Sequence, residues 1–84
     1  MDIEAVKSGI KTNVYHIPAG KNVPLHKHPD SDEVFYCIGG AGYGVLENED
    51  LLLEPGQTFI VPAGTMHALK TNGDLYVCSF LIPK

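Results

Sequence analysis

The sequence predicts an all-β fold built as one domain over residues 1–84. From Thr12 onward, short apolar or alternating runs are interrupted roughly every 6 to 12 residues by Gly, Pro, Asn or Asp, which is the rhythm of a β-sandwich or barrel. Apolar residues spaced as on one face of a helix are nearly absent. A chain of 84 residues is also too short for two ordinary domains. One β-barrel therefore accounts for the whole chain.

The expected strands are short, and each is bounded by residues that form turns. They cover residues 13–17, 23–28, 33–38, 42–46, 50–54, 57–62, 66–71 and 75–82. The first eleven residues are a further candidate for an edge strand, and Asn72-Gly73 suits a tight hairpin turn. The apolar residues that we expect in the core are Phe35, Phe59, Val61, Leu69, Val77 and Leu81.

The composition excludes two classes of partner. The formal net charge is −4, and all six basic residues are Lys, scattered along the chain. Because Arg supplies the fork that binds phosphate and guanine edges with paired hydrogen bonds, a chain without Arg is not expected to bind nucleic acid. No apolar run approaches the ~20 residues that span a bilayer, so no membrane partner is expected.

The two cysteines, Cys37 and Cys78, bear on the compartment. No N-terminal run has the order of basic, apolar and small residues of a secretory signal, so the expected location is the cytoplasm. In a reducing compartment both thiols are expected to stay free. Cys37 shares the strand parity of Glu33 and Phe35, so all three should face the interior. Packing is the first role expected of this thiol, and lining a pocket is the alternative.

Three histidines and one glutamate have a spacing that can hold a metal ion. His26 and His28 lie two residues apart in one expected strand, so their side chains point to the same face. Glu33 begins the next expected strand after a Pro-Asp-Ser-Asp turn, and His67 follows a Pro-Ala-Gly turn near the start of its own strand. Three imidazole nitrogens and one carboxylate suit Fe, Mn, Co, Ni, Cu or Zn, and they do not suit Ca or Mg.

The same residues stand in two sequence motifs. Residues 20–40 read G-x5-H-x-H-x4-E-x5-G-G, and residues 56–72 begin G-x5-P-x-G-x2-H. The pair resembles the two signature motifs of the cupin superfamily, the RmlC-like barrels. This resemblance implies a double-stranded β-helix jelly roll, a small-molecule ligand or substrate, and a homodimer paired through edge strands. It also implies a divalent transition metal held by His26, His28, Glu33 and His67. Gln57 and Thr71 depart from the usual second motif, outside the ligand set.

Three functions stay open. The first is a metalloenzyme acting on a small organic molecule, with dioxygenase-like chemistry first and isomerase, decarboxylase or lyase chemistry as alternatives. The second is a non-catalytic module that binds a sugar or metabolite, and the third is a metal that mainly stabilises the barrel. Tyr36, Tyr43 and Tyr76 are hydroxyl donors without an assigned role, and His16 is expected to be an ordinary strand residue. No cationic side chain is expected in the interior, which disfavours carboxylate and phosphate ligands.

Overall fold

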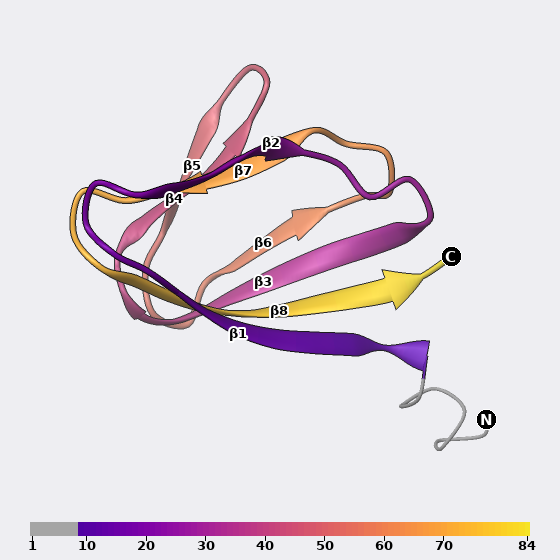
Figure 1. Cartoon of the computed structure of the whole chain (residues 1–84), viewed down its shortest axis with the longest axis horizontal. Helices are drawn as coiled ribbons and strands as arrows, with labels where there is room; N and C mark the ends of the chain where they lie inside the picture. The colour runs from indigo at the N-terminus through magenta and orange to yellow at the C-terminus, as the bar shows by residue number, and fades with distance from the viewer. Residues whose placement is uncertain (1–8) are drawn as a thin grey trace.

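The chain folds into two four-stranded antiparallel sheets that face each other (Figure 1). A computed structural model describes residues 9–84. Its strands are β1 (Lys11–Ile17), β2 (Asn22–His26), β3 (Ser31–Gly40), β4 (Gly42–Leu46), β5 (Asp50–Leu53), β6 (Thr58–Val61), β7 (His67–Lys70) and β8 (Leu75–Pro83). The β8 sheet has the order β1-β8-β3-β6, and the β7 sheet has the order β2-β7-β4-β5. The predicted all-β jelly roll is confirmed. Within residues 9–84, no helix is long and apolar enough to cross a membrane.

All the predicted strands are present, and their ends differ from the prediction by at most two residues. The hairpin predicted at Asn72-Gly73 is wrong, because the strands on either side of it, β7 and β8, belong to different sheets. Thr71 fixes this crossing: its hydroxyl donates a hydrogen bond to Ala41 O at 2.6 Å and accepts one from Gly73 N–H at 3.1 Å. The edge strand considered for the first eleven residues falls mostly on residues 1–8, outside the described residues.

The core lies between the inward faces of the two sheets. Because side chains alternate along a strand, β3 turns Phe35 inward and β8 turns Val77 inward, while their neighbours face out. The buried apolar cluster consists of Ile17, Phe35, Cys37, Leu53, Phe59, Val61, Leu69, Leu75 and Val77. Of the predicted core residues, only Leu81 is missing from this cluster; it is half-buried beside a cavity described below.

Gly44 on β4 shows how closely the two sheets approach. A Cβ atom at this position would lie 2.5 Å from the ring of Phe59 on β6. Any side chain there would push Phe59 aside or separate the sheets. The glycine therefore lets Phe59 fill the core and stack with Phe35 at a centroid distance of 5.8 Å.

The two cysteines lie on opposite faces of the β8 sheet. Cys37 is fully buried and faces inward from β3. Cys78 pairs with Tyr36 in the register of β8 and β3, and both side chains face outward. Both thiols are free, and their opposite directions keep them from bridging one another.

Candidate metal centre

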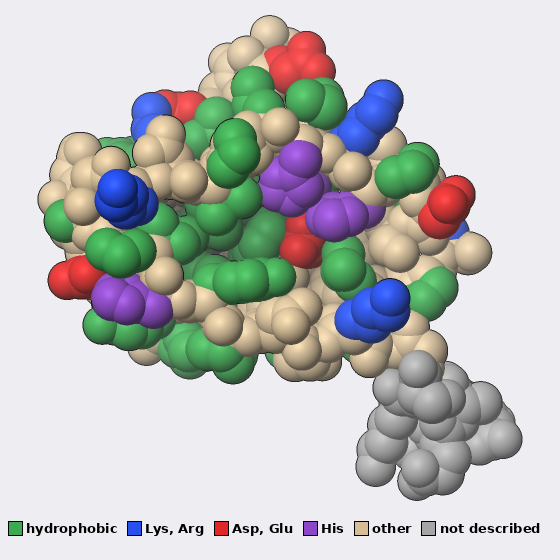
Figure 2. All heavy atoms as spheres, in the orientation of Figure 1, with side chains coloured by type: hydrophobic (Ala, Val, Ile, Leu, Met, Phe, Trp, Pro, Cys, Tyr) green, Lys and Arg blue, Asp and Glu red, His purple; other side chains and the backbone are tan. Residues whose placement is uncertain are grey.

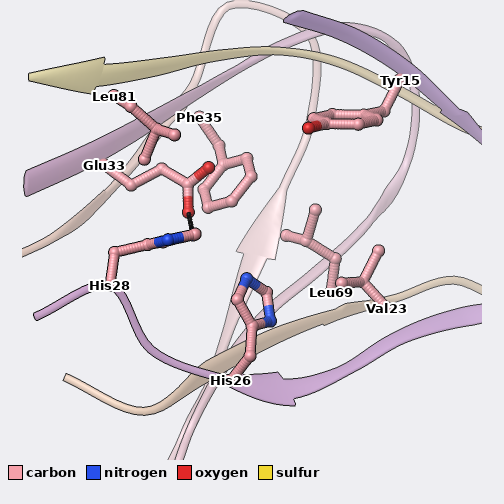
Figure 3. A pocket seen from close by; sticks show the side chains of 8 residues that line it. All are labelled: Tyr15, Val23, His26, His28, Glu33, Phe35, Leu69 and Leu81. Carbon is pink, nitrogen blue, oxygen red and sulfur yellow. Dashed lines mark ion pairs between the residues drawn. The ribbon is translucent and has the colours of Figure 1, made fainter. Parts of the chain in front are cut away.

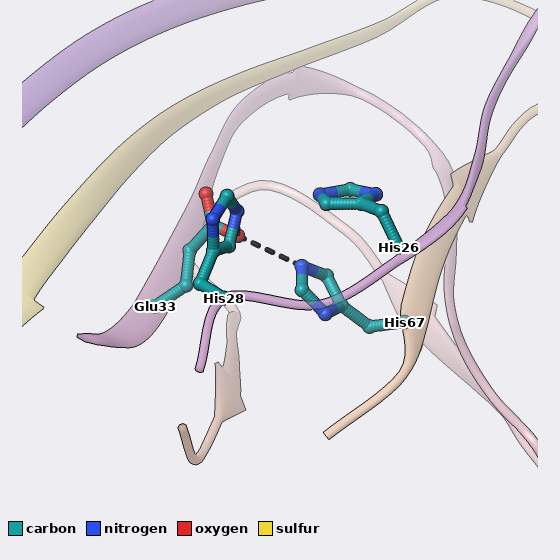
Figure 4. A group of neighbouring side chains, drawn as sticks. All are labelled: His26, His28, Glu33 and His67. Carbon is teal, nitrogen blue, oxygen red and sulfur yellow. Dashed lines mark hydrogen bonds and ion pairs between the residues drawn. The ribbon is translucent and has the colours of Figure 1, made fainter. Parts of the chain in front are cut away.

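His26, His28, Glu33 and His67 meet between the two sheets (Figure 4). His26 ends β2, His67 begins β7, and Glu33 comes from β3 in the opposite sheet. His28 lies in the loop after β2. One ligand atom from each side chain lies within 4.8 Å of those of the other three. The structure therefore brings together all four residues predicted as metal ligands.

Strand pairing sets the positions of His26 and His67. β2 and β7 are antiparallel neighbours, and His26 lies directly opposite His67 in their register. The centroids of the two rings are 4.3 Å apart. Glu33 reaches them from the inward face of β3, where Val61 and Leu81 are its partners on the two neighbouring strands. The cluster thus joins the two sheets.

His28 reaches the cluster by a route that differs from the predicted one. The sequence predicts a strand that continues to His28, in which alternation places both histidines on one face. In the structure, a register shift follows Val23 and β2 ends at His26. Pro29, which follows His28, has no N–H to continue the pairing. The loop, and not the strand, therefore turns His28 toward the other ligands.

Two hydrogen bonds hold the loop of His28 and the start of β3 against the loop that precedes His67. His28 O accepts a hydrogen bond from Gly64 N–H at 2.9 Å. Asp32 Oδ1 accepts one from Ala63 N–H at 2.8 Å. Gly64 has a φ of 81°, in the left-handed region that glycine adopts without steric cost. Asp32, a turn residue by sequence, thus helps to set the distance between His28 and His67.

Backbone carbonyls orient two of the imidazole rings. His67 Nδ1–H donates to Thr65 O at 2.9 Å, and His26 Nδ1–H donates to Pro24 O at 2.8 Å. Each bond fixes the orientation of the ring through Nδ1, so that its Nε2 faces the interior. Histidine ligands of metal ions are held in this way, with the second nitrogen donating to a carbonyl or carboxylate. The two rings are therefore oriented as ligands would be.

Glu33 is buried at the centre of the cluster, with 4% of its surface exposed. Its Oε1 accepts a hydrogen bond from His67 Nε2 at 2.8 Å and lies 3.3 Å from His28 Nε2. Its Oε2 accepts a hydrogen bond from the hydroxyl of Ser79 on β8. Both carboxylate oxygens therefore have partners, as a buried charge requires.

The pKa values of this pair follow from burial and from its hydrogen bonds. Burial raises the pKa of Glu33, but the hydrogen bonds from His67 and Ser79 and the nearby positive charge outweigh it, so the pKa lies below its ordinary value of 4.5. Burial lowers the pKa of His67, but its bonds to Glu33 and Thr65 raise it above its ordinary value of 6.5. A carbonyl can only accept, so His67 carries a proton on Nδ1. Both pKa directions favour an imidazolium beside a carboxylate.

The donor set fits a divalent transition metal ion. Two nitrogen ligands of one ion lie at most about 4.2 Å apart, because each is about 2.1 Å from it. Donors within 4.8 Å of one another need to close by only about half an ångström to reach that limit. For His67, the ion would replace the proton shared with Glu33, since a metal ligand must give up its proton.

A cavity of about 160 Å³ opens beside the cluster (Figures 2 and 3). It is lined by Tyr15, Val23, His26, His28, Glu33, Phe35, Leu69 and Leu81. Figure 2 shows apolar side chains over the floor of this hollow, with imidazole and carboxylate groups on one side of it. In Figure 3 the hydroxyl of Tyr15 points into the cavity from β1. A small molecule there would touch the cluster, the hydroxyl and an apolar wall.

A lysine borders the same region. Lys11 and His28 both line a neighbouring groove at the end of β1. In the register of the β8 sheet, Lys11 is opposite Leu81, which is opposite Glu33, so all three belong to the inward face. Lys11 is exposed at the rim of this groove, and among the described residues no lysine lines the cavity beside the cluster.

Sequence reasoning missed Ser79. Its signal is a small polar residue at an inward position of β8, between the apolar inward residues Val77 and Leu81. A buried hydroxyl at such a position needs a hydrogen-bond partner. The only acid predicted to face inward from the neighbouring strand was Glu33, so the contact could have been found once the strands were paired.

Sequence reasoning also missed Tyr15 and considered the three other tyrosines. Tyr15 shares the strand parity of Ile17, which is buried, and this places it on the inward face of β1. Tyr36 and Tyr76 face outward from the β8 sheet. Tyr43 lies under Lys70 on the β7 sheet. Tyr15 is therefore the tyrosine that borders the cavity.

His16 and Cys37 lie apart from the cluster. His16 Nε2 is 2.8 Å from Asp74 Oδ1, and its ring stacks on Tyr76 at a centroid distance of 4.3 Å. Cys37 faces inward as predicted, but its thiol donates to Gly39 O at 3.5 Å and does not line the cavity. Burial raises the pKa of the Cys37 thiol. This residue packs in the core.

Two facing antiparallel sheets with a three-histidine, one-carboxylate cluster between them define a class of small β-barrel proteins. A family model described as the cupin domain matches residues 13–82. The chain therefore belongs to the cupin family.

The curated relatives are longer than this chain. An uncharacterized protein from Methanocaldococcus jannaschii is 31% identical over 72 residues, which cover 83% of this chain and 58% of the relative. A protein from Thermotoga maritima named "oxalate-binding protein" is 28% identical over 58 residues, covering 69% of this chain and 48% of the relative. The chain thus spans about half the length of the curated relatives that it matches.

Solved structures agree on the fold. A predicted oxalate decarboxylase from Thermotoga maritima superposes with a TM-score of 0.86 at 24% identity, covering 100% of this chain and 76% of that chain. The DMSP lyase DddQ from Ruegeria pomeroyi superposes with a TM-score of 0.83 at 24% identity, covering 90% of this chain and 39% of that chain. At these identities the likeness shows the double-stranded β-helix fold.

Proposed function

We propose that this chain binds one divalent transition metal ion through His26, His28, Glu33 and His67 and uses it to hold a small organic acid. The observation that carries the proposal is the placement of four donor atoms within 4.8 Å of one another beside a cavity of about 160 Å³. Four protein ligands leave positions open on an ion that accepts five or six. Residues 1–84 are proposed as one cupin domain that acts as a homodimer in the cytoplasm.

The cavity favours a ligand of few atoms. Sites for drug-sized molecules have volumes of about 300–1,000 Å³, whereas this cavity has about 160 Å³. The Tyr15 hydroxyl can donate a hydrogen bond, and the Lys11 ammonium beside His28 attracts negative charge. A small carboxylate would bind the ion and accept a hydrogen bond from the hydroxyl together. The names of the Thermotoga maritima relative and of the Thermotoga maritima structure both mention oxalate, which supports this ligand class.

We propose further that the bound acid is a substrate. A divalent ion supplies Lewis-acid activation of a carboxylate or enolate, and iron would add dioxygenase chemistry, which we place ahead of decarboxylase, isomerase and lyase chemistry. The chain's own residues orient the molecule and exclude water: Tyr15 donates a hydrogen bond, and Val23 and Leu69 form part of the apolar wall. Glu33 has both oxygens engaged, so it serves as a ligand and not as a general base.

A binding module without turnover is the second candidate, and the lining of the cavity favours it. Apart from the proposed ligands, Tyr15 is the only residue lining the cavity within the described part of the chain that can transfer a proton. A protein with so few proton donors and acceptors around its cavity can hold a ligand more readily than it can convert one. Product formation separates the two candidates, because only the enzyme changes the ligand.

Titration of the cobalt-loaded protein with oxalate tests the proposal. Oxalate should shift the visible spectrum of the cobalt and bind stoichiometrically, and the chelator-treated protein should bind none. The Tyr15→Phe variant keeps its cobalt, and its affinity for oxalate falls about 3- to 10-fold, because one hydrogen bond is lost. Equal binding without metal, or a silent spectrum across a panel of small acids and diols, contradicts the proposal. Incubation of the iron-loaded protein with oxalate and O2 then tests for turnover.

A further inference from the structure

The turn Asn72-Gly73 has the sequence of a hairpin, but the structure uses it differently. Together with Thr71 and Asp74 it forms the crossing, residues 71–74, which leads from β7 in one sheet to β8 in the other (Figure 1). Asn72 and Gly73 are both exposed. The φ of Gly73 is not positive, and a Cβ atom added there would meet no atom within 4 Å. The backbone of the crossing therefore does not require glycine at this position.

An asparagine followed by glycine can lose its side-chain amide without an enzyme. Here the backbone nitrogen of Gly73 would attack Asn72 Cγ, so that a new C–N bond forms. The Cγ–Nδ2 bond then breaks, and the amide leaves as ammonia with the proton of the Gly73 N–H. Water opens the cyclic imide to aspartate or isoaspartate. Glycine favours this attack because it carries no side chain and its backbone turns freely.

The crossing holds the attacking nitrogen in a hydrogen bond. Gly73 N–H donates to Thr71 Oγ1 at 3.1 Å. Thr71 is itself fixed, since it is buried and its hydroxyl donates to Ala41 O at 2.6 Å. The Gly73 nitrogen must lose its proton to attack, and a hydrogen bond made by that proton favours the form that keeps it. The hydroxyl of Thr71 therefore opposes the reaction.

A backbone contact supports the same arrangement. Ala41 N–H donates to Asp74 O at 3.0 Å. Ala41 thus binds the crossing on both sides of the Asn72-Gly73 pair, through its carbonyl to Thr71 and through its N–H to Asp74. Thr71 is one of the two residues that depart from the usual cupin motif, so the family resemblance does not explain this contact.

We propose that Asn72 is a site of spontaneous deamidation and that the hydroxyl of Thr71 sets its rate. The reaction is slow while Thr71 holds the Gly73 N–H, and it is fast when the crossing opens. The other asparagines, Asn13, Asn22 and Asn48, precede Val, Val and Glu. These residues carry side chains that hinder the attacking nitrogen, so they should react more slowly than an unprotected Asn72.

Deamidation would change the corner between the two sheets. It adds a carboxylate next to Asp74, whose own carboxylate lies 2.8 Å from His16 Nε2. Isoaspartate also lengthens the main chain before Gly73, which moves the Gly73 N–H away from Thr71. The crossing of a modified chain should therefore open more readily, and its urea midpoint should fall below that of the unmodified chain.

Incubation of the purified full chain at neutral pH tests the proposal, with peptide mass spectrometry to follow the conversion of Asn72. A synthetic peptide of residues 68–76 gives the rate without the fold. Thr71→Val removes the hydroxyl and keeps the shape of the side chain, whereas Thr71→Ser keeps the hydroxyl. The wild type and Thr71→Ser should react about 3- to 10-fold more slowly than Thr71→Val and the peptide, because one hydrogen bond is worth about that factor.

Two further measurements identify the cause. Gly73→Ala should keep the fold, since its Cβ atom has room, and should slow the reaction by about 10-fold or more, because a side chain hinders the nitrogen. Hydrogen exchange of the Gly73 N–H should be faster in Thr71→Val than in Thr71→Ser. Circular dichroism should show that all variants are folded.

Three results overturn the proposal. The first is a wild type that deamidates at Asn72 as fast as the peptide does, and this comparison does not depend on the folding of any variant. The second is a folded Thr71→Val variant that reacts as slowly as the wild type. The third is a Thr71→Val variant in which Asn13, Asn22 or Asn48 reacts faster than Asn72.

Discussion

The molecule contains two histidine–carboxylate pairs of the same length in different surroundings. His67 Nε2 lies 2.8 Å from Glu33 Oε1, and His16 Nε2 lies 2.8 Å from Asp74 Oδ1. The side chains of the first pair are 1% and 5% exposed, and those of the second are 45% and 56% exposed. Two further imidazoles and a buried hydroxyl converge on the first pair alone. Burial and convergence, and not distance, distinguish the site from the surface contact.

The difference also explains why the buried pair is there. An exposed ion pair is worth little, because water screens it. A buried pair costs desolvation that its attraction barely offsets, and apolar side chains in its place often stabilise a protein more. A charged pair beside a core of apolar side chains therefore points to a role in ligand binding.

Removing the carboxylates one at a time gives the largest contrast. With chelator present, Glu33→Ala should lower the free energy of unfolding by about 3–5 kcal/mol, because His67 and Ser79 lose a buried partner. Asp74→Ala should lower it by about 1 kcal/mol or less. Urea unfolding followed by circular dichroism measures both. Similar losses in the two variants would mean that burial does not separate the pairs. Glu33→Gln, which keeps an acceptor for Ser79, should fall between them.

His28→Ala tests the convergence around the buried pair. This side chain is 34% exposed and comes from a loop, so the barrel should stay folded without it. Metal affinity should fall by about 100-fold or more, since loss of a ligand costs at least as much as loss of an outer-shell partner. Competition with a chromophoric chelator measures it. Lys27→Ala, one residue away, is the control and should keep its metal. Unchanged affinity in His28→Ala would refute the four-ligand cluster.

Ser79→Ala sharpens the comparison, because only the buried pair has a hydroxyl behind its carboxylate. Without this hydrogen bond Glu33 is less well oriented, and metal affinity should fall about 10-fold or more. The same chelator competition applies. Cys78→Ala, the neighbouring residue on β8 that faces outward, should bind metal as the wild type does. A Ser79→Ala variant with wild-type affinity would make the hydroxyl a packing feature only.

The pH dependence of stability gives the smallest effect. The lowered pKa of Glu33 stabilises the folded protein. This stabilisation is complete above pH 4.5, the ordinary pKa of the group, and it is lost as the pH falls through the lower pKa of the folded state. The raised pKa of His67 also stabilises the folded protein. This stabilisation is complete below pH 6.5, the ordinary pKa of the group, and it is lost as the pH rises through the higher pKa of the folded state. Chelator-treated protein should thus be most stable between about pH 4.5 and 6.5.

Urea midpoints across this range measure the profile of the wild type. Glu33→Ala should flatten the maximum, because the pair that produces it is gone. Asp74→Ala should keep the shape of the wild-type profile. A wild-type stability that rises steadily through pH 7.5 would contradict the assigned directions.

The fold and the four ligands could be predicted because local chemistry determines both. Turn-forming residues separate every pair of strands, and each predicted strand is present. The spacing of the ligands predicts the cluster even where a strand end is predicted wrongly, because His28 points to the cluster although β2 ends at His26. Gly64, the second glycine of the motif in residues 56–72, has a positive φ, as a glycine at a turn can adopt without steric cost.

Features that depend on strand pairing could not be predicted. The turn at Asn72-Gly73 is chemically suited to a hairpin, but only the sheet order shows that it crosses between sheets. Ser79 and Tyr15 gain their roles from neighbours far away in the sequence, and parity alone does not identify those neighbours.

Metal content of the purified protein tests the central claim most directly. The wild type, His67→Ala and His16→Ala would be prepared without chelators or tags and measured by elemental mass spectrometry. Near one transition metal ion per chain is expected in the wild type and in His16→Ala, and almost none in His67→Ala. Metal retained in His67→Ala, or lost in His16→Ala, would show that the buried pair is not the centre of the site.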